Sequence, residues 1–301
     1  MVKRGDKTRL VLARLNIVKG RIEKEDEIME KNIRPAKWAL VTGASSGIGR
    51  EIVKQLESYG YGSILVARRR SRLEDLAQNL RFKTYIIEAD LSQASAARDL
   101  CKKIDQLEDK EAIRVDLLVN NAGFGDLGFF GETDLDKELN MIHVNIESLH
   151  ILMKHYLKKF INHNEGYILN VASSAGLMPA GPYMSTYYAS KAYVTSLTCG
   201  VAKELRDRGS GVVVSALCPG PVDTEFNDVA NCSFGISGIG PDQCASEALE
   251  NLFKKKTIII PSKKMRLVNK LSRLVTRDML INICGRQQKK KMVDCIINLY
   301  N

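Results

Sequence analysis

The sequence predicts an α/β protein with a single doubly wound sheet of seven parallel strands and helices on both faces. Three observations carry this prediction. Short, continuously apolar segments recur along most of the 301 residues, as expected for strands that are buried on both faces. Amphipathic helical segments separate them, which favours parallel pairing. A glycine-rich turn follows the first strand, where such sheets bind ligands.

The first half of the chain supplies four strands and the helices between them. The first strand begins at Trp38 as a run of four apolar residues and ends at a Thr-Gly turn. Apolar residues spaced three and four positions apart then indicate a helix. The predicted strands are Trp38–Val41, Ser63–Ala67, Thr84–Ile87 and Val115–Val119, and the predicted helices are Arg50–Tyr59, Leu73–Leu80 and Ala94–Leu107.

The second half continues the alternation, and the three predicted strands bring the sheet to seven. Its predicted elements are a long helical stretch around Leu139–Phe160, a strand at Tyr167–Val171, a helix at Tyr187–Arg206, and strands at Val212–Leu217 and Thr257–Ile260. Residues 37–262 therefore form one domain. Residues 1–36 are a charged N-terminal extension, and residues 263–301 are a basic, amphipathic, helical C-terminal extension. We hypothesise that translation starts at Met29, which would leave residues 1–28 untranslated.

The net charge of +10 lies at the two ends of the chain. Residues 1–36 carry ten basic and six acidic side chains, and residues 254–301 carry thirteen and two. The residues between these ends have a net charge of −5. A nucleic-acid-binding domain needs a positive surface of its own, so we expect no nucleic-acid partner.

The cysteines and histidines point to a cytoplasmic protein without a metal. Seven cysteines, with no Cys-x-x-Cys pair, predict free thiols in a reducing compartment. The four histidines fall on or just after one helical stretch, and no carboxylate or cysteine pattern completes a metal site. No apolar run is long enough to span a bilayer, and the basic start lacks the apolar core of a secretory signal.

The turn after the first strand reads Thr-Gly-Ala-Ser-Ser-Gly-Ile-Gly. Glycines let the backbone turn tightly and approach a pyrophosphate, and the start of the next helix offers unpaired N–H groups. A plain strand-to-helix turn is the alternative, but three glycines at this junction favour nucleotide binding. The predicted contacts are Gly43, Ser45, Ser46, Gly47, Ile48 and Gly49.

The end of the second strand predicts that the nucleotide is NADP(H). A carboxylate at that position would hydrogen-bond the ribose diol of NAD and repel a 2′-phosphate. The sequence has Arg68, Arg69 and Arg70 there instead, and guanidinium groups bind phosphate in a bidentate manner. At least one of Arg69 and Arg70 is expected to be a solvated residue at a helix start, and Arg68 is favoured as the phosphate contact.

Tyr187 and Lys191 are four positions apart on one predicted helix, so their side chains share a face. A free tyrosine titrates at about pH 10, which is too high for proton exchange at neutral pH. A nearby ammonium favours the phenolate and lowers that pKa. The pair could therefore exchange a proton with a carbonyl compound or an alcohol.

Six motifs occur in a fixed order within residues 37–262. They are Thr42-Gly43-x-x-x-Gly47-x-Gly49, Asn120-Asn121-Ala122-Gly123, Asn145, Ser173, Tyr187-x-x-x-Lys191 and Pro219-Gly220-Pro221-Val222-Asp223-Thr224. With these motifs the sequence resembles the short-chain dehydrogenase/reductase (SDR) family. The resemblance implies a Rossmann fold and hydride transfer between NADP(H) and a carbonyl or alcohol substrate.

The resemblance also implies a role for each matched residue. Tyr187 would be the general acid in reduction and the base in oxidation, and Lys191 would lower its pKa and hold the nicotinamide ribose. Ser173 would hydrogen-bond the substrate oxygen. Asn145 would hold a water that links Lys191 to solvent. The other cofactor contacts would be Asp90 and Leu91 at the adenine, Asn121 along the cofactor, and Val222 and Thr224 at the nicotinamide carboxamide.

Two of these assignments have competitors. The family's usual spacing from serine to tyrosine selects Ser174, whereas the flanking motif selects Ser173. A one-residue insertion within residues 178–185 would reconcile the spacing with Ser173. Ser173 is therefore favoured. Tyr183 and Tyr188 are competing hydroxyls, but the family's tyrosine is the first of the Tyr-Tyr pair, so Tyr187 is preferred.

The substrate is expected to be an apolar carbonyl compound or alcohol, and steroid-like and acyl-chain-like molecules both remain open. Residues 227–241 are predicted to form a mobile lid over it. Residues 263–291 form a predicted basic amphipathic helix, for which packing on the domain or at a subunit interface is favoured over an anionic membrane surface. The resemblance implies a homodimer or homotetramer.

A catalytically idle nucleotide-binding scaffold or sensor, which would hold a partner through its basic ends, is the rival hypothesis. The complete set of serine, tyrosine, lysine and asparagine argues against it.

Overall fold

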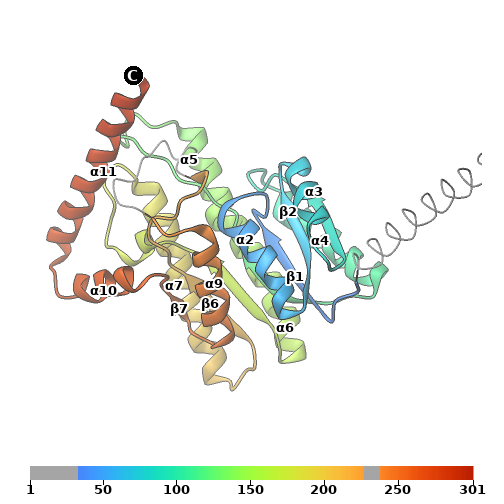
Figure 1. Cartoon of the computed structure of the whole chain (residues 1–301). Coiled ribbons are helices and arrows are strands. Elements are labelled where there is room, and N and C mark those ends of the chain that lie inside the picture. The colour runs from blue at the N-terminus through green and yellow to red at the C-terminus, as the bar shows by residue number, and fades with distance from the viewer. Residues whose placement is uncertain (1–32, 227–237, 301) are drawn as a thin grey trace, which may run out of the picture.

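Seven parallel strands form the centre of the fold, in the order β3-β2-β1-β4-β5-β6-β7 (Figure 1). The structure is a computed structural model that describes residues 33–226 and 238–300, and side chains as far as residue 292. The doubly wound parallel sheet that the sequence predicts is confirmed. The strands are β1 Lys37–Thr42, β2 Tyr61–Ala67, β3 Thr84–Glu88, β4 Val115–Asn120, β5 Tyr167–Val171, β6 Val213–Leu217 and β7 Ile258–Ile259.

Helices cover both faces of this sheet, and alternate residues of β1 show how the core is divided. Ala39 and Val41 pack against α2, α3 and α9, whereas Trp38 and Leu40 pack in the opposite layer with α4, α6 and α7. This two-residue alternation is the side-chain period of a strand. The helices are α2 Gly47–Leu56, α3 Arg70–Gln78, α4 Ala96–Glu111, α6 Leu149–His163, α7 Ser185–Asp207 and α9 Pro241–Phe253, with a short η1 at Glu57–Tyr59.

The order of the strands reverses between β1 and β4. β1 pairs with β2 on one side and with β4 on the other, and all of these pairs are parallel. The connections after β1 and β4 therefore diverge and leave a crevice at the carboxyl ends of the strands. The predicted glycine turn follows β1 and the predicted Asn121 follows β4, so the fold brings both to this crevice.

Two parts of the helical layer differ from the sequence prediction. The long helical stretch around Leu139–Phe160 divides into α5 at Leu135–Ile142, a π-helical turn η2 at His143–Ser148, and α6. Helix α9 was not predicted, because Cys244, Ala245 and Ala248 give its buried face little apolar contrast. The predicted lid falls largely on residues 227–237, which lie outside the described residues.

The C-terminal extension forms two helices, α10 at Lys263–Ser272 and α11 at Arg277–Tyr300, so the expectation of one helix over residues 263–291 is wrong. Thr276 explains the break, because its Oγ1 accepts a hydrogen bond from Met279 N at 3.4 Å, as an N-terminal capping residue does. Asp278 adds a negative charge in the first turn of α11. Within the described residues, no helix combines the length and the apolarity needed to cross a membrane.

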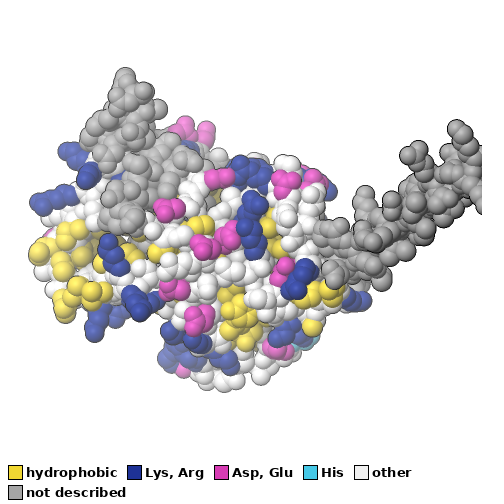
Figure 2. All heavy atoms as spheres, viewed as in Figure 1, with side chains coloured by type: hydrophobic (Ala, Val, Ile, Leu, Met, Phe, Trp, Pro, Cys, Tyr) yellow, Lys and Arg dark blue, Asp and Glu magenta, His cyan; other side chains and the backbone are white. Residues whose placement is uncertain are grey.

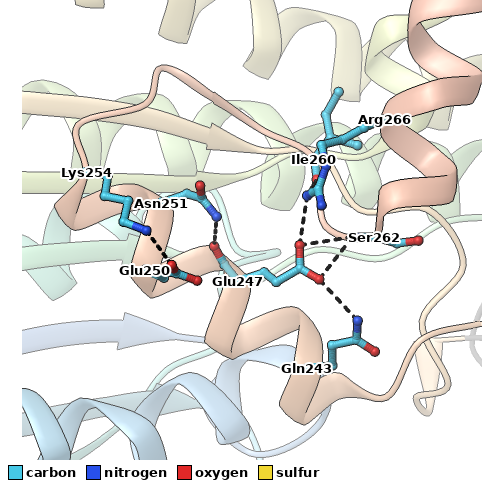
Figure 3. A network of polar contacts seen from close by, with 8 residues as sticks. All are labelled: Gln243, Glu247, Glu250, Asn251, Lys254, Ile260, Ser262 and Arg266. Carbon is cyan, nitrogen blue, oxygen red and sulfur yellow. Dashed lines mark hydrogen bonds and ion pairs between the residues drawn. The ribbon is translucent and has the colours of Figure 1, made fainter.

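Polar contacts around Glu247 fix the start of α10 to α9 (Figure 3). The Glu247 carboxylate accepts hydrogen bonds from Arg266 Nη1 at 2.9 Å and from the Ser262 amide at 3.2 Å. Arg266 also donates to the Ile260 carbonyl oxygen at 2.9 Å. Burial of Glu247 opposes its ionisation, but the hydrogen bonds from Arg266, Gln243 and Ser262 outweigh this effect and lower its pKa.

Candidate active site

A cleft of about 1000 Å³ opens at the carboxyl ends of the central strands. It takes its walls from the glycine turn, from the segments after β2 to β6, from α7, and from α10 and α11. The predicted site residues that line it are Gly43, Ser45, Ser46, Gly47, Ile48, Arg68, Asp90, Leu91, Asn121, Ser173, Tyr187, Lys191, Val222 and Thr224. Gly49 and Asn145 lie behind the cleft surface.

The glycine turn has the geometry that a pyrophosphate needs. Gly43 and Gly47 have φ angles of +64° and +54°, which favour glycine over other residues. A Cβ at Gly43 would lie 2.7 Å from Asn121 Nδ2, and a Cβ at Gly49 would collide with the same amide. Asn121 Nδ2 donates to the Thr42 and Gly43 carbonyl oxygens at 3.0 Å each, so it holds the turn in place.

The start of α2 offers its amide groups to the cleft. Ser46, the residue before the first turn, makes no side-chain hydrogen bond to that turn, and the turn holds no acidic residue. Unsatisfied N–H groups and the positive end of the helix dipole favour an anion at this place. The residues present therefore fit a dinucleotide phosphate.

Two arginines lie at the far end of the glycine turn. Arg68 and Arg69 both line the cleft, directly after the end of β2. Arg69 Nη2 donates to Ser46 Oγ at 3.0 Å and to Ser45 Oγ at 3.3 Å, and its Nη1 pairs with Glu225 at 2.9 Å. Arg72 also pairs with Glu225. Sequence reasoning ranked Arg68 first and missed Glu225, because only the fold brings that carboxylate to the turn.

Local contacts hold the remaining residues for which the sequence predicts cofactor contacts. Asp90 Oδ1 accepts from Ser92 N at 3.1 Å and from Ser92 Oγ at 2.9 Å, and Leu91 beside it is buried. Val222 forms an isolated bridge with Ile239. Thr224 packs against Gly47, where a Cβ would lie 3.2 Å from Thr224 Cγ2. The structure thus brings these residues to one cleft.

Tyr187 and Lys191 lie on one face of α7 and both reach the cleft. Lys191 is only 4% exposed, and its Nζ donates to the Val171 carbonyl oxygen at 2.9 Å. The same Nζ lies 5.9 Å from the centre of the Tyr187 ring. Burial lowers the pKa of Lys191 to about 8, so the group is still mostly charged at neutral pH.

Ser173 stands at the end of β5, just before the short helix η3 at Ser174–Leu177. Its Oγ accepts a hydrogen bond from Ala175 N at 3.1 Å, a contact that does not use the O–H hydrogen of Ser173. Ser174 lines the cleft as well, and its amide donates to the Pro219 carbonyl oxygen at 2.7 Å. The structure therefore brings both candidate serines to the cleft.

Asn145 lies in the π-helical turn η2 and is fully buried. Its Oδ1 accepts from Phe124 N at 3.1 Å, and its Nδ2 donates to the Phe124 carbonyl oxygen at 2.9 Å and to Ser190 Oγ at 3.1 Å. A Cβ at Gly123 would lie 2.9 Å from Asn145 Oδ1 and 3.2 Å from Lys191 Nζ, so these two groups face the same small space. Such π-turns often occur at functional sites.

Helix α11 supplies contacts that sequence reasoning missed. Gln288 is 4% exposed, and its Nε2 donates to the Tyr188 hydroxyl at 2.8 Å. Burial, together with the nearby Cys284, raises the pKa of Tyr188 well above its usual value, so this phenol stays neutral. Amphipathic spacing showed that residues 263–291 are helical, but it could not show which surface they cover.

Many apolar side chains line the part of the cleft beyond Tyr187, together with Lys264, Gln287, Gln288 and Lys291. The Tyr187 ring lies 5.5 Å from that of Phe226, and both pack in a cluster with Met141 and Met184. Further apolar side chains of α10 and α11 line the opposite wall: Met265, Val268, Leu271, Leu280 and Ile283.

His150 and His155 contact different side chains within the chain and do not share a site. His155 Nε2 lies 2.9 Å from Asp105 Oδ1, and His150 Nδ1 lies 2.7 Å from the Tyr193 hydroxyl. Within the described part of the chain, no group of three or more His, Cys, Asp or Glu side chains could hold a metal ion.

Comparison with known proteins gives the same family from sequence and from structure. The profile of the short chain dehydrogenase family matches residues 37–232. The chain is 34% identical over 192 residues to an uncharacterized oxidoreductase of Staphylococcus saprophyticus, a match that covers 64% of this chain and 80% of that protein.

Two further matches extend over more of the chain. It is 26% identical over 260 residues to the 7beta-hydroxysteroid dehydrogenase of Collinsella aerofaciens, covering 83% of this chain and 95% of that one. A solved short-chain dehydrogenase from Sphingobium yanoikuyae in complex with NADPH has a TM-score of 0.69 at 27% identity, covering 79% of this chain and 94% of that one.

Proposed function

The chain belongs to the short chain dehydrogenase family, and we propose that it is an NADP(H)-dependent oxidoreductase that interconverts an apolar ketone or aldehyde and the corresponding alcohol. One observation carries the proposal. The glycine turn, the buried Lys191, Tyr187 and Ser173 all open on the same cleft, whose far half carries many apolar side chains. A dinucleotide and a carbonyl compound can therefore meet there.

In the direction of reduction, the carbonyl carbon would receive a hydride from NADPH held at the glycine turn, which would become NADP⁺. The Tyr187 hydroxyl gives its proton to the carbonyl oxygen, so that an alcohol forms. The Lys191 ammonium stabilises the phenolate that remains. The Ser173 hydroxyl donates a hydrogen bond to the oxygen as negative charge develops on it, and Ser174 is its alternative in this role. Oxidation of the alcohol reverses these steps.

In this proposal Asn145 does not contact the substrate but holds a water next to Lys191. It faces the same small space as Lys191 Nζ, beside Gly123. A water held there would pass a proton from solvent towards Lys191 and on to Tyr187. The Phe124 and Ser190 contacts fix the orientation of the Asn145 amide for this purpose.

The preference for NADP(H) over NAD(H) rests on the charges at the end of β2. Arg68 and Arg69 line this part of the cleft, and the end of the strand holds no carboxylate. Ser45 and Ser46 hold the Arg69 guanidinium at the glycine turn. A 2′-phosphate would form charge-assisted hydrogen bonds with these guanidinium groups in place of the contact between Arg69 and Glu225.

An apolar ketone of steroid-like size is the proposed substrate class. The apolar wall from Phe226 to α11 favours it, and so does the similarity of most of this chain to a 7beta-hydroxysteroid dehydrogenase. A panel of ketosteroids, 3-oxoacyl thioesters and aromatic ketones, each with NADPH and with NADH, tests the proposal. We expect turnover of ketosteroids with NADPH at a kcat/KM at least tenfold above that with NADH. Turnover with NADH alone would contradict the cofactor assignment.

The proposal places the enzyme in the cytoplasm as a homodimer or homotetramer. The five cysteines with described side chains are all free, and Cys101, Cys218 and Cys244 are buried, which suits a reducing compartment. Sedimentation of the purified chain measures the oligomeric state.

A further inference from the structure

Helix α10 leaves an apolar face exposed to solvent. None of its ten residues is buried. Leu267 and Leu271 are 57% and 51% exposed, and their spacing places them on one side of the helix, whereas Leu274, in the turn after the helix, is 83% exposed. Short helices are marginal in water without packing, and contiguous exposed apolar patches mark interaction sites.

The start of α11 extends this patch. Met279 and Ile283 are 56% and 45% exposed. We use the term apolar face for Leu267, Val268, Leu271, Leu274, Met279 and Ile283. Figure 2 shows hydrophobic side chains gathered at the edge of the molecule that α10 and α11 occupy, with lysine and arginine side chains next to them.

Exposed basic residues lie on the same segment of the chain as the apolar face, and we call them the basic rim. It consists of five exposed residues, Lys263, Lys264, Lys270, Arg273 and Arg277. Across residues 33–226 and 238–292, no carboxylate lies within ion-pair distance of any of them. By contrast, Arg266 on the inner side of α10 is paired with Glu247. Asp278, beside Arg277 in the chain, is the one acidic residue between positions 263 and 283, so the segment that carries the rim is strongly positive.

We propose that the apolar face and its basic rim bind the surface of an anionic lipid bilayer. Leucine side chains next to lysines and arginines are typical of helices that lie in a membrane interface, with the apolar side chains among the acyl chains and the cations at the headgroups. A second copy of the chain is a poorer occupant, because a symmetric contact would bring the two positive rims against each other.

The apolar face is continuous with the cleft. Val268, Leu271 and Ile283 belong to the face and also line the cleft wall. A lipid-dissolved ketone could thus pass from the bilayer to Tyr187 without crossing water. This last consequence rests on the proposed function, whereas membrane binding itself does not.

Co-sedimentation of the full chain with vesicles, without cofactor or substrate, tests the proposal. We compare vesicles of phosphatidylcholine alone with vesicles of phosphatidylcholine and phosphatidylglycerol. The expected result is binding at least about tenfold tighter to the anionic vesicles, which weakens as salt is added. Absence of binding to anionic vesicles would overturn the proposal and leave the reductase assignment untouched.

Paired leucine variants locate the binding surface. Leu267 and Leu274 lie outside the cleft lining, so Leu267→Ser with Leu274→Ser should keep the fold and weaken vesicle binding about tenfold. The matched control is Leu135→Ser with Leu139→Ser on α5, whose side chains are 67% and 44% exposed. Equal binding by both double variants would overturn the proposal. So would a lower sedimentation mass of the first variant, because a second copy would then cover the face.

Discussion

Tyr187 and Tyr188 are neighbours on α7, yet their surroundings give them different chemistry. Tyr187 shares its helix face with the Lys191 ammonium, whereas Tyr188 faces Gln288 and Cys284 of α11. The sequence could separate the two phenols only by their order in the Tyr-Tyr pair. It could not show that burial raises the pKa of Tyr188, because that burial comes from a helix about 100 residues away in the chain.

The Tyr188→Phe variant tests this separation. It removes the hydroxyl that accepts from Gln288 and leaves Tyr187 with Lys191 in place. We expect kcat to stay within about threefold of the wild type, because the group that gives the proton is unchanged. The loss of one hydrogen bond should lower the free energy of unfolding by about 1 kcal/mol. Steady-state kinetics and urea unfolding measure the two effects, and a loss of kcat of more than about 100-fold would reassign the proton donor to Tyr188.

Because Lys191 is buried, the free energy of unfolding should change with pH in the alkaline range. Burial lowers its pKa to about 8 in the folded chain, against 10.5 for an ordinary lysine. Between these two pH values the unfolded chain binds more protons than the folded chain, so the free energy of unfolding rises with pH there. Below pH 8 both states are protonated and this contribution is constant.

The Lys191→Met variant should lack that rise, which is on the order of 3 kcal/mol across the window. Urea unfolding of the wild type and the variant at several pH values measures it. The difference between the two profiles removes the contributions of tyrosines and cysteines that titrate in the same range. Parallel profiles would show that Lys191 has an ordinary pKa in the folded chain.

Arg68 and Arg69 should determine the cofactor. Alanine at either position removes a guanidinium from the phosphate end of the cleft, so we expect kcat/KM for NADPH to fall about tenfold or more while that for NADH changes little. Arg70→Ala is the matched control, because Arg70 pairs with Glu74 and does not line the cleft. A comparable loss with Arg70→Ala would place the phosphate elsewhere.

At the scale of elements, strands were more predictable than helices. The seven strands are continuous apolar runs because both faces of the sheet are covered, and each was located within one or two residues. Helix α9 escaped prediction because small residues let it approach α2 closely and give it little apolar contrast. The break between α10 and α11 depends on one capping hydroxyl, that of Thr276.

Substitution of Glu247 tests how much its contacts with Ser262 and Arg266 stabilise the packing of α10 on α9. Glu247→Gln removes the charge that holds Arg266 and the Ser262 amide, so we expect a loss of about 1 kcal/mol in the free energy of unfolding, discounted because Arg266 is partly exposed. Glu250→Gln on the same helix is the control, because its partner Lys254 is exposed and no measurable change is expected. Thermal unfolding compares the two. An equal change in thermal stability in the two variants would mean that Glu247 stabilises the fold no more than the exposed Glu250 does.

In the whole molecule, the structure of the domain at residues 37–262 could be predicted from the sequence better than the positions of α10 and α11, which form one wall of the cleft. Motif order identified most of the residues that line the cleft near the glycine turn, because the turn after β1 and the turn after β4 are local features of the chain. The substrate side depends on which surface α10 and α11 cover, and helical periodicity carries no information about that surface. Much of the basic charge at the end of the sequence lies on α10 and α11.

The central claim is that this cleft is a catalytic site and more than a binding site for a nucleotide. The most direct test measures NADPH binding and alcohol formation from ketosteroids in the wild type and in Tyr187→Phe. We expect equal NADPH affinity in both proteins, one alcohol formed for each NADPH consumed by the wild type, and a rate at least about 100-fold lower in the variant. NADPH binding without alcohol formation by the wild type, or equal rates in the two proteins, would contradict it.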